Sequence, residues 1–439
     1  MALQSPPDGR NRRPAVRDTS LADWLGKLEA AHPSQIDLGL DRVLAVAKRL
    51  GLDRSACPVI TVAGTNGKGS CVATLERLLL ASGCSTGVYT SPHLRRYNER
   101  VRLDGTEVDD ARLCAAIEAV DRAREGVSLT YFEHGTLAAL QVFREAAPDW
   151  LLLEVGLGGR LDAVNIVAPT VAVVTSIGLD HQDWLGPDRE SIGREKAGIF
   201  RAGIPAVVGD RDPPHSLHET AARLGSSWYA IGDAFDESTR ASGDWSWRGC
   251  GRDGARVEYT RLPAPRLLGS NVACALQALS LCAALPGRDV LERVLPHIKI
   301  EGRMQSLQRG GVECLLDVAH NPDGMRVLVQ RLLAAPPAGR SVVVMGAMKD
   351  KDCAGIIASL AAVADAWFFC DLPGDRAESA ARLAGFVQGA APATCHAGVS
   401  EALDAAFAAV VPGDRLLVCG SFHAVGPALD WFDEHPEGA

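Results

Sequence analysis

Short runs of consecutive apolar residues recur along the chain, and each is followed by a glycine-bearing turn and an amphipathic, helix-like segment. In the first half these runs are Val59–Ala63, Thr86–Tyr89, Leu151–Val155, Val171–Ser176 and Pro205–Gly209. Parallel strands that are buried on both faces have continuous apolar runs of this kind, whereas half-exposed strands alternate. The pattern predicts an α/β protein with a doubly wound parallel sheet.

A second alternation of the same kind fills the last third of the chain. It covers about 140 residues, which is the size of one domain. Its strand-like runs are Glu313–Val318, Ser341–Gly346, Ala366–Cys370 and Arg415–Cys419. We expect one α/β domain at residues 19–298 and a second at 299–439, with a hinge at Leu295–Ile300 and a disordered tail at 1–18.

Three stretches of the first domain have a different pattern. Leu21–Leu50 has helical periodicity, interrupted at His32–Gly39. Residues 210–262 predict short, exposed β-structure or loops, and a helix is expected after them from Asn271 to Leu285. The first domain is therefore expected to carry helices and a small β-region in addition to its sheet.

The composition limits the classes of function. A chain of 439 residues is too long for one ordinary core, and its 47% hydrophobic and 23% charged residues are typical of a soluble globular protein. The formal net charge is 45 − 54 = −9, which argues against a nucleic-acid or anionic-membrane partner. A protein of this charge that binds an anionic nucleotide must gather its cations locally.

The twelve cysteines point to a reducing compartment. No two of them lie within four residues of each other, so neither a zinc ribbon nor a Cys-x-x-Cys redox motif is present. The N-terminal segment has basic residues but no apolar stretch after them, and no apolar run approaches the roughly 20 residues of a membrane span. We expect reduced cysteines and a cytoplasmic protein.

A candidate phosphate-binding loop runs from Gly64 to Ser70, directly after a predicted strand and at the start of a helix expected near Gly69–Ser82. Glycines allow the backbone N–H groups to turn around a phosphate, and Lys68 and the helix N-terminus add positive charge. The match to the general pattern is imperfect, because Val62 occupies the first glycine position and Gly69 separates Lys68 from Ser70. The alternative is a glycine-rich turn with a solvated lysine.

Polar residues follow three other predicted strands. Glu154 ends one apolar run, His181 follows the next, and Ser91 follows the strand at Thr86–Tyr89. The carboxyl ends of parallel strands form the ligand-binding edge of an open α/β sheet, and Mg²⁺ prefers oxygen ligands. The alternatives are a salt bridge from Glu154 to Arg160 and a histidine that only caps a helix or fills a pocket. From its helical surroundings alone, Lys196 is a surface lysine.

Together these motifs resemble the dihydrofolate synthase and folylpolyglutamate synthase family of the Mur-type amide ligases, over roughly residues 20–430. The chain departs from the family pattern at Glu301, where the family often has Pro, and at Ala424, where Thr is usual. The matching segments are IDLGLDRV, VAGTNGKGS, YTSPHLRRYNERV, LTYFEHGTLAAL, LEVGLGGRLDAVNIV, TSIGLDHQDWLGPDRESIGREKAGIF, DVAHNP, KDKD and VCGSFHAV.

The resemblance implies a fold and a set of site residues. ATP is expected between an N-terminal phosphate-loop domain and a C-terminal Rossmann-like domain, with two Mg²⁺ ions. Lys196 matches a position that is carbamylated in the family, where it helps to hold the second metal. The implied ATP-binding residues are Gly64, Thr65, Asn66, Gly67, Lys68, Gly69, Ser70, Asn271, Arg303, Asp317 and His320; the metal ligands are Ser91, Glu154, His181 and carbamylated Lys196; and the pterin pocket is Leu38, Thr130, Phe132, Asp162 and Ala163.

The implied activity is ATP-dependent addition of L-glutamate to dihydropteroate, and of further glutamates to folates, through an acyl phosphate, in folate biosynthesis. Lys68, Lys196 and His181 are the implied catalytic residues, the partners are small molecules, and the family is usually monomeric. Phe132 suits a flat pterin, which gains from aromatic stacking. Two alternatives stay open: another Mur-type ligase of muramyl-peptide or cyanophycin-like type, and a phosphate-loop nucleotide switch.

Overall fold

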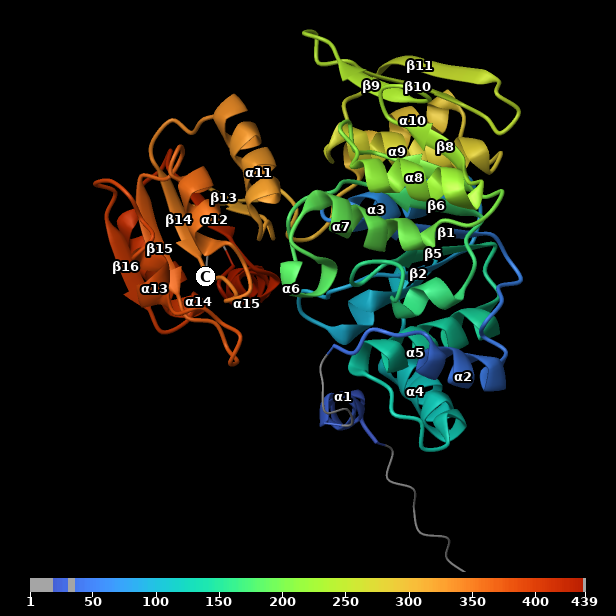
Figure 1. Ribbon diagram of the computed structural model, residues 1–439. Helices are drawn as coiled ribbons and strands as arrows, with labels where there is room; N and C mark the ends of the chain where they lie inside the picture. The colour runs from blue at the N-terminus through green and yellow to red at the C-terminus, as the bar shows by residue number, and fades with distance from the viewer. Residues whose placement is uncertain (1–18, 31–35, 437–439) are drawn as a thin grey trace, which may run out of the picture.

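The computed structural model describes residues 19–30 and 36–436, so the tail expected at 1–18 lies outside the described residues. The chain forms a larger lobe and a smaller C-terminal lobe that meet along one side (Figure 1). Each lobe has its own β-sheet with helices on both faces, which confirms the α/β class. Within the described ranges, no helix combines the length and the apolar composition that a bilayer crossing demands.

The larger lobe is built on an eight-stranded sheet in the order β4-β3-β2-β5-β1-β6-β7-β8. The strands from β2 to β8 in this order are parallel, and β3 and β4 form an antiparallel edge. The central strands are buried along their whole length, as their apolar runs predict. The strands are β1 (Val59–Ala63), β2 (Thr86–Tyr89), β3 (Val101–Leu103), β4 (Thr106–Glu107), β5 (Trp150–Glu154), β6 (Val171–Val174), β7 (Pro205–Val208) and β8 (Ser227–Ala230).

Alternate residues of each strand face opposite sides of this sheet, so the lobe has two cores. In β1, Val59 and Ala63 pack in one core, and Ile60 and Val62 pack in the other. The first core is covered by α1 (Leu21–Ala30), α2 (Asp41–Leu50), α4 (Asp110–Arg124), α5 (Tyr131–Ala146), α7 (Arg189–Lys196) and α8 (His215–Leu224), and the second by α3 (Lys68–Ala81), α9 (Gly269–Leu281) and α10 (Arg288–Val294).

The β-region expected at 210–262 is present but is not simply exposed. It forms a three-stranded antiparallel sheet of β9 (Asp236–Thr239), β10 (Trp245–Cys250) and β11 (Arg256–Leu262). Trp245 and Trp247 are each only 1% exposed, because alternate β10 side chains face α9. The prediction of exposure was wrong because it followed from the glycines and charges of the segment. The two tryptophans are two positions apart, so both lie on the same face of the strand.

The smaller lobe has a six-stranded sheet in the order β12-β13-β17-β14-β15-β16, in which only β12 is antiparallel. Its strands are β12 (Gln305–Arg309), β13 (Val312–Leu316), β14 (Ser341–Met345), β15 (Ala366–Cys370), β16 (Ala393–His396) and β17 (Arg415–Cys419). One face packs on α11 (Pro322–Ala334), α12 (Cys353–Leu360) and α13 (Ala380–Ala384), and the other on α14 (Val399–Ala409) and α15 (Phe422–Glu434).

This topology brings separate segments to one edge of the larger sheet. Strands β5, β1 and β6 are adjacent and parallel, so the loops that follow them leave the sheet side by side. These loops carry Glu154, the glycine-rich segment 64–67 and the segment 175–181. Figure 1 shows the short helix α6 (Gln182–Leu185), which follows β6, at the junction with the smaller lobe.

Candidate active site

The loop after β1 is shaped by two glycines that no other residue could replace without movement. Gly67 caps α3 at φ 86°, and a Cβ there would lie 2.3 Å from Asn271 Oδ1. Gly64 has φ 150°, and a Cβ there would lie 1.9 Å from Thr175 Oγ1. The loop therefore turns tightly against β6 and α9 and leads into the N-terminus of α3, as a phosphate-binding loop does.

Two lysines converge on this loop. Lys68 Nζ donates to the carbonyl oxygen of Gly64 at 3.0 Å, and Lys196 Nζ donates to the same oxygen at 3.1 Å. Burial lowers the pKa of Lys68, and burial together with the charge of Lys68 lowers the pKa of Lys196 to about 7. Lys196 is only 4% exposed, so it is not the surface residue that its helix alone suggests.

Glu154 is a buried carboxylate at the end of β5. It is 5% exposed, and its Oε2 accepts a hydrogen bond from Ser91 N at 3.3 Å. Arg160, the alternative partner, binds Glu195 at 2.9 Å instead, and within the described ranges Glu154 forms no ion pair. Burial raises the pKa of Glu154 because a charge in this position lacks solvation. A divalent cation here would supply the missing counter-charge.

The predicted metal ligands border one cavity. Ser91, Glu154, His181 and Lys196 all line a cleft of about 620 Å³. Burial lowers the pKa of His181 to about 4, so the imidazole is neutral and can offer a nitrogen to a metal. Among the described residues, no three His, Cys, Asp or Glu side chains cluster as a metal site. A cation at Glu154 and His181 would therefore need a hydroxyl, water or phosphate oxygens as further ligands, which suits Mg²⁺.

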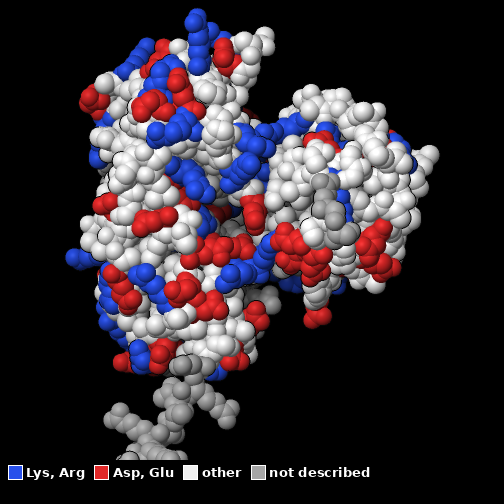
Figure 2. Space-filling view, turned by 180° about the vertical axis from the view of Figure 1, so that it is seen from behind, with Lys and Arg blue, Asp and Glu red and all other residues white. Residues whose placement is uncertain are grey.

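The smaller lobe forms the opposite wall of this cleft. Asp317 accepts hydrogen bonds from Met304 N and Ala319 N, each at 2.9 Å, and the Arg303 guanidinium lies 5.2 Å from the centre of the Phe422 ring. Asn271, Arg303, Asp317 and His320 all line the same cavity as the phosphate-binding loop. Figure 2 shows Lys and Arg side chains gathered along part of the seam between the lobes, although the chain as a whole is acidic.

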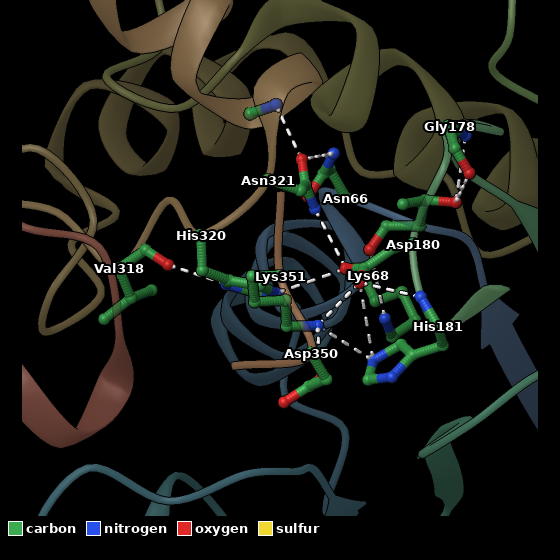
Figure 3. A network of polar contacts seen from close by, with 12 residues as sticks. Asn66, Lys68, Gly178, Asp180, His181, Val318, His320, Asn321, Asp350 and Lys351 are labelled. Atoms are coloured by element: carbon green, nitrogen blue, oxygen red, sulfur yellow. Dashed lines mark hydrogen bonds and ion pairs between the residues drawn. The ribbon is translucent and has the colours of Figure 1, made fainter. Parts of the chain in front are cut away.

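A polar network joins the two lobes beside the phosphate-binding loop (Figure 3). Asp180 accepts hydrogen bonds from Lys351 Nζ at 2.6 Å and Asn321 Nδ2 at 3.1 Å, and its carboxylate lies 3.4 Å from His320 Nε2. Burial opposes the ionisation of Asp180, but the hydrogen bond from His320 and the charge of Lys351 hold its pKa well below the usual range. Asn66 and Asn321 exchange two hydrogen bonds, each 3.0 Å long.

No role is predicted from the sequence for Asp180, Asn321 or Lys351. All three follow parallel strands, whose polar end residues face a ligand, Asp180 in the first sheet and the other two in the second. Asn321 follows β13 and Lys351 follows β14, so the same rule applied to the second sheet would have found both.

A second cavity, of about 400 Å³, adjoins the 620 Å³ cleft. We call the larger space the nucleotide cleft and the smaller one the acceptor pocket. Phe132 lies against Gly156, where a Cβ would approach the Phe132 ring to 2.5 Å. Asp162 accepts hydrogen bonds from Leu157 N at 2.8 Å and Val164 N at 3.0 Å, and burial raises its pKa to about 6. The five predicted pterin-pocket residues all line this pocket: Leu38, Thr130, Phe132, Asp162 and Ala163.

The smaller lobe closes the other side of the acceptor pocket. It contributes Met348, Lys351, Arg376, Ser421, Phe422 and His423. The two spaces meet at two of the proposed metal ligands, Ser91 and His181. The residues that line both the acceptor pocket and the nucleotide cleft are Ser91, Pro92, Gly156, Leu157, His181, His320 and Phe422.

A phosphate-binding loop, a second α/β lobe across the cleft and an adjoining acceptor pocket define a two-domain ATP-dependent ligase. Residues 302–422 match the family model described as Mur ligase, glutamate ligase domain. The chain belongs to the dihydrofolate synthase/folylpolyglutamate synthase family, because it is 43% identical to the Escherichia coli (strain K12) protein of that name over 418 residues, 95% of this chain and 97% of the relative.

Solved structures agree with this assignment. E. coli FolC in complex with DHPP and ADP superposes with a TM-score of 0.89 at 43% identity, covering 94% of this chain and 98% of that one. A bifunctional folylpolyglutamate synthase/dihydrofolate synthase with Mn, AMPPNP and L-glutamate bound superposes with a TM-score of 0.86 at 44% identity, covering 94% and 97%. The chain is thus an ATP-dependent ligase, and nothing supports the alternatives of a muramyl-peptide ligase, a cyanophycin-like ligase or a nucleotide switch.

Proposed function

We propose that one active site, at the junction of the two cavities, catalyses two ligations. The first joins L-glutamate to dihydropteroate and gives dihydrofolate, and the second adds further glutamates to the γ-carboxylate of folates. The observation that carries the proposal is the adjacency of the two cavities. A pterin in the acceptor pocket would direct its carboxylate toward Ser91 and His181, where the nucleotide cleft begins.

In this proposal the larger lobe holds the triphosphate. The backbone of Gly64–Ser70, Lys68 and the N-terminus of α3 bind the phosphates, while Asn271, Arg303 and Asp317 contact the nucleotide and His320 lies near its phosphates. Ser91, Glu154 and His181 hold Mg²⁺, which neutralises phosphate charge when bound. The support is that all these residues line one cleft and that the buried Glu154 forms no ion pair within the part of the chain that the structure describes.

The reaction proceeds in two displacements. The acceptor carboxylate attacks the γ-phosphorus of ATP, so that a C–O–P bond forms as the bond to ADP breaks. The amine of L-glutamate then attacks the acyl carbon, phosphate leaves, and the amine releases its proton. Lys68 stabilises the charge that develops on the transferred phosphoryl group, and the two lobes hold the reactants in line and exclude water.

The glutamate that is added enters from the smaller lobe. L-Glutamate carries two carboxylates, and Lys351 and Arg376 are the cations on that wall of the acceptor pocket. Both are oriented by carboxylates, since Lys351 binds Asp180 at 2.6 Å and Arg376 binds Asp350 at 3.1 Å. A relative of this chain has been solved with L-glutamate bound.

We also propose that Lys196 is carbamylated and holds a second Mg²⁺. Only a neutral amine reacts with CO₂, and burial together with Lys68 lowers the pKa of Lys196 to about 7, so much of it is neutral near physiological pH. Carbamylation would convert the Lys196 side chain, which lies beside Lys68, from a cation into an anionic oxygen ligand. The placement of Lys196 Nζ 3.1 Å from the Gly64 carbonyl supports a position beside the phosphates.

The organisation of the chain is part of the proposal. A boundary at residues 298/299 would separate domains of 19–298 and 299–439, and it is supported by the order of the sheets, because β12 is the first strand of the second sheet. The chain is proposed to act as a monomer in the cytoplasm. The twelve cysteines all lie in the described ranges and form no disulfide bond, which fits a reducing compartment.

The proposal is tested by an assay of the purified protein with ATP, Mg²⁺, L-glutamate and dihydropteroate. The expected products are dihydrofolate and ADP in equal amounts, followed by γ-glutamyl extension when dihydrofolate is the acceptor. In the same assay Lys68→Ala should lose activity. Its matched control is Lys48→Ala, which changes an exposed lysine on α2. ATP turnover that does not depend on a pterin, or an inert wild-type protein, would contradict the proposal.

A further inference from the structure

The segment after β2 carries Ser91 and reaches across to the smaller lobe; residues 91–96 are called the bridging segment. Leu94 belongs to the larger lobe, but its partly buried side chain packs against the core of the smaller lobe. Its main-chain oxygen lies against α15, because a Cβ at Gly426 would be 2.3 Å from Leu94 O. Figure 1 shows α15 on the side of the smaller lobe that faces the larger lobe. Leu94 is therefore a contact between the lobes, three positions after a proposed metal ligand.

The bridging segment is fixed on the side of the larger lobe. The Glu99 carboxylate accepts hydrogen bonds from the three consecutive backbone N–H groups of Leu94–Arg96, at 2.6, 2.7 and 2.6 Å. Hydrogen bonds to an ionised acceptor are short and strong. They leave this part of the chain little freedom, so a displacement of Leu94 would be transmitted to Ser91.

On the side of the smaller lobe, Leu94 reaches the main chain that carries two proposed nucleotide-binding residues. A Cβ at Gly302 would lie 3.0 Å from Val318 Cγ1 and 3.3 Å from Leu94 Cδ1, so both side chains lie against Gly302. Val318 N also donates to Gly302 O at 2.8 Å. Gly302 directly precedes Arg303, and Val318 directly follows Asp317. Leu94 thus lies between the bridging segment and the main chain that places these two side chains.

Arg95 adds ion pairs at the edge of this contact. Its guanidinium lies 2.7 Å from the Asp433 carboxylate and 3.2 Å from that of Asp430, both on α15. The side chains of Asp430 and Asp433 are 58% and 70% exposed, so water screens these pairs and they contribute little to docking. The apolar contact of Leu94 is the main anchor.

We propose that Leu94 is a positioning residue that aligns Ser91 of the larger lobe with Arg303 and Asp317 of the smaller lobe. Ser91 N donates to Glu154 Oε2 at 3.3 Å, so a shift of the bridging segment would separate two proposed metal ligands. This inference rests on the proposed function, because the roles of these residues come from it. Docking of the smaller lobe and binding of the metal–nucleotide complex therefore stabilise each other.

The sharpest test adds one methyl group beneath the bridging segment. In Gly426→Ala the helix itself is favoured, since alanine forms helix better than glycine, but the three atoms nearest to the added Cβ all belong to Leu94. The Kd for Mn²⁺ in the presence of AMPPNP, measured by EPR of the free ion, should rise about 10- to 100-fold, the scale of losing the support of a metal ligand. The matched control is Gly398→Ala, where a Cβ meets nothing within 4 Å.

Activity measurements separate a positioning role from a loss of structure. In Gly426→Ala the Mg²⁺ concentration for half-maximal activity should rise by the same factor, and saturating Mg²⁺ should restore kcat to within about twofold of wild type. The Kd for dihydropteroate without nucleotide should also stay within about twofold, which would show that the larger lobe is folded. Leu94→Ala, which removes the anchor without adding bulk, should weaken Mn²⁺ binding by a smaller factor.

Wild-type Mn²⁺ affinity in both Gly426→Ala and Leu94→Ala would overturn the role of Leu94. A loss of kcat that saturating Mg²⁺ does not restore would also overturn it, because the defect would then lie outside the metal site. A wild type that makes no dihydrofolate would instead overturn the proposed function. The two failures are distinguishable, since the Mn²⁺ affinity is measured without turnover.

Discussion

The nucleotide cleft and the acceptor pocket are neighbouring spaces built in different ways. The cleft is lined by seven consecutive residues, Gly64–Ser70, and by polar side chains from both lobes. The acceptor pocket has no such contiguous motif, and side chains from α5, the loops after β2 and β5 and the smaller lobe form its walls. In the proposed function the ATP chemistry is therefore common to both ligations, whereas the acceptor pocket is the part of the site where their substrates differ.

The two spaces also differ in how their charges are arranged. In the cleft, Lys68 and Lys196 share the Gly64 carbonyl, and burial lowers the pKa of both. The lining of the acceptor pocket instead includes a buried carboxyl with a raised pKa, Asp162, and a cation, Arg100. Changes in the cleft should therefore affect both reactions equally, and changes in the pocket should depend on the acceptor.

The largest effect is expected from Lys68→Ala. Loss of this ammonium should reduce kcat with dihydropteroate and with dihydrofolate by at least about 100-fold, because a charge-stabilising contact to the transferred phosphoryl group disappears. Steady-state kinetics with each acceptor measure the ratio of the wild-type kcat to the variant kcat, and Lys48→Ala is the control. A variant that spared one acceptor would show that the two ligations do not share the cleft.

The next largest effect is expected from Lys196→Arg. Arginine keeps a positive charge but cannot become a carbamate, so both activities should fall about 10- to 100-fold, as when a metal site loses a supporting group. Carbon NMR with ¹³C-labelled bicarbonate should show a carbamate signal in wild type that the variant lacks. Lys196→Ala with full activity would contradict the carbamate.

The acceptor pocket should respond to pH through Asp162. Its pKa of about 6 means that the carboxyl is ionised at pH 7 and mostly protonated at pH 5. A pterin offers N–H donors that need the ionised form, so the Kd for dihydropteroate should rise about tenfold between pH 7 and pH 5. Titration calorimetry measures this, and Asp162→Asn should bind weakly at both pH values. A wild-type Kd that does not change with pH would show that Asp162 takes no part in pterin recognition.

The sequence predicted the cleft better than the pocket, for a physical reason. The phosphate-binding loop and the strand-end residues Glu154 and His181 follow from local rules, namely where apolar runs stop and where glycines permit a turn. Predicting the acceptor pocket requires knowing that Leu38 and Phe132, which are far apart in the chain, line the same cavity, and only the family resemblance indicated this. The burial of Trp247 also depended on tertiary packing, which local composition does not encode.

The network between the lobes was missed because each of its contacts joins residues from different domains. Asp180 and Lys351 are 171 positions apart, and Asn66 and Asn321 are 255 positions apart. The strand-end rule indicates that Asn321 and Lys351 face a ligand, but no window of sequence pairs them with residues of the first sheet. The contact appears only once the second sheet is placed beside the first.

The smallest effect is expected from Asn321→Ser, which tests whether this network couples the two spaces. Serine can still cap α11, as Asn321 does by accepting from Gly324 N at 2.8 Å, but it is too short to reach Asn66 and Asp180. Losing these hydrogen bonds, one of which goes to the Asp180 carboxylate, should lower kcat/KM for L-glutamate about threefold with either acceptor.

Asp109→Ser, which alters the cap of α4 far from the cleft, is the matched control for this variant and should leave both activities unchanged. A loss confined to one acceptor would mean that Asn321 acts on the pocket alone. An equal loss with both acceptors means that docking of the smaller lobe sets the position of Lys351 and His320, so that Asn321, which lines neither cavity, tunes a step that the two ligations share.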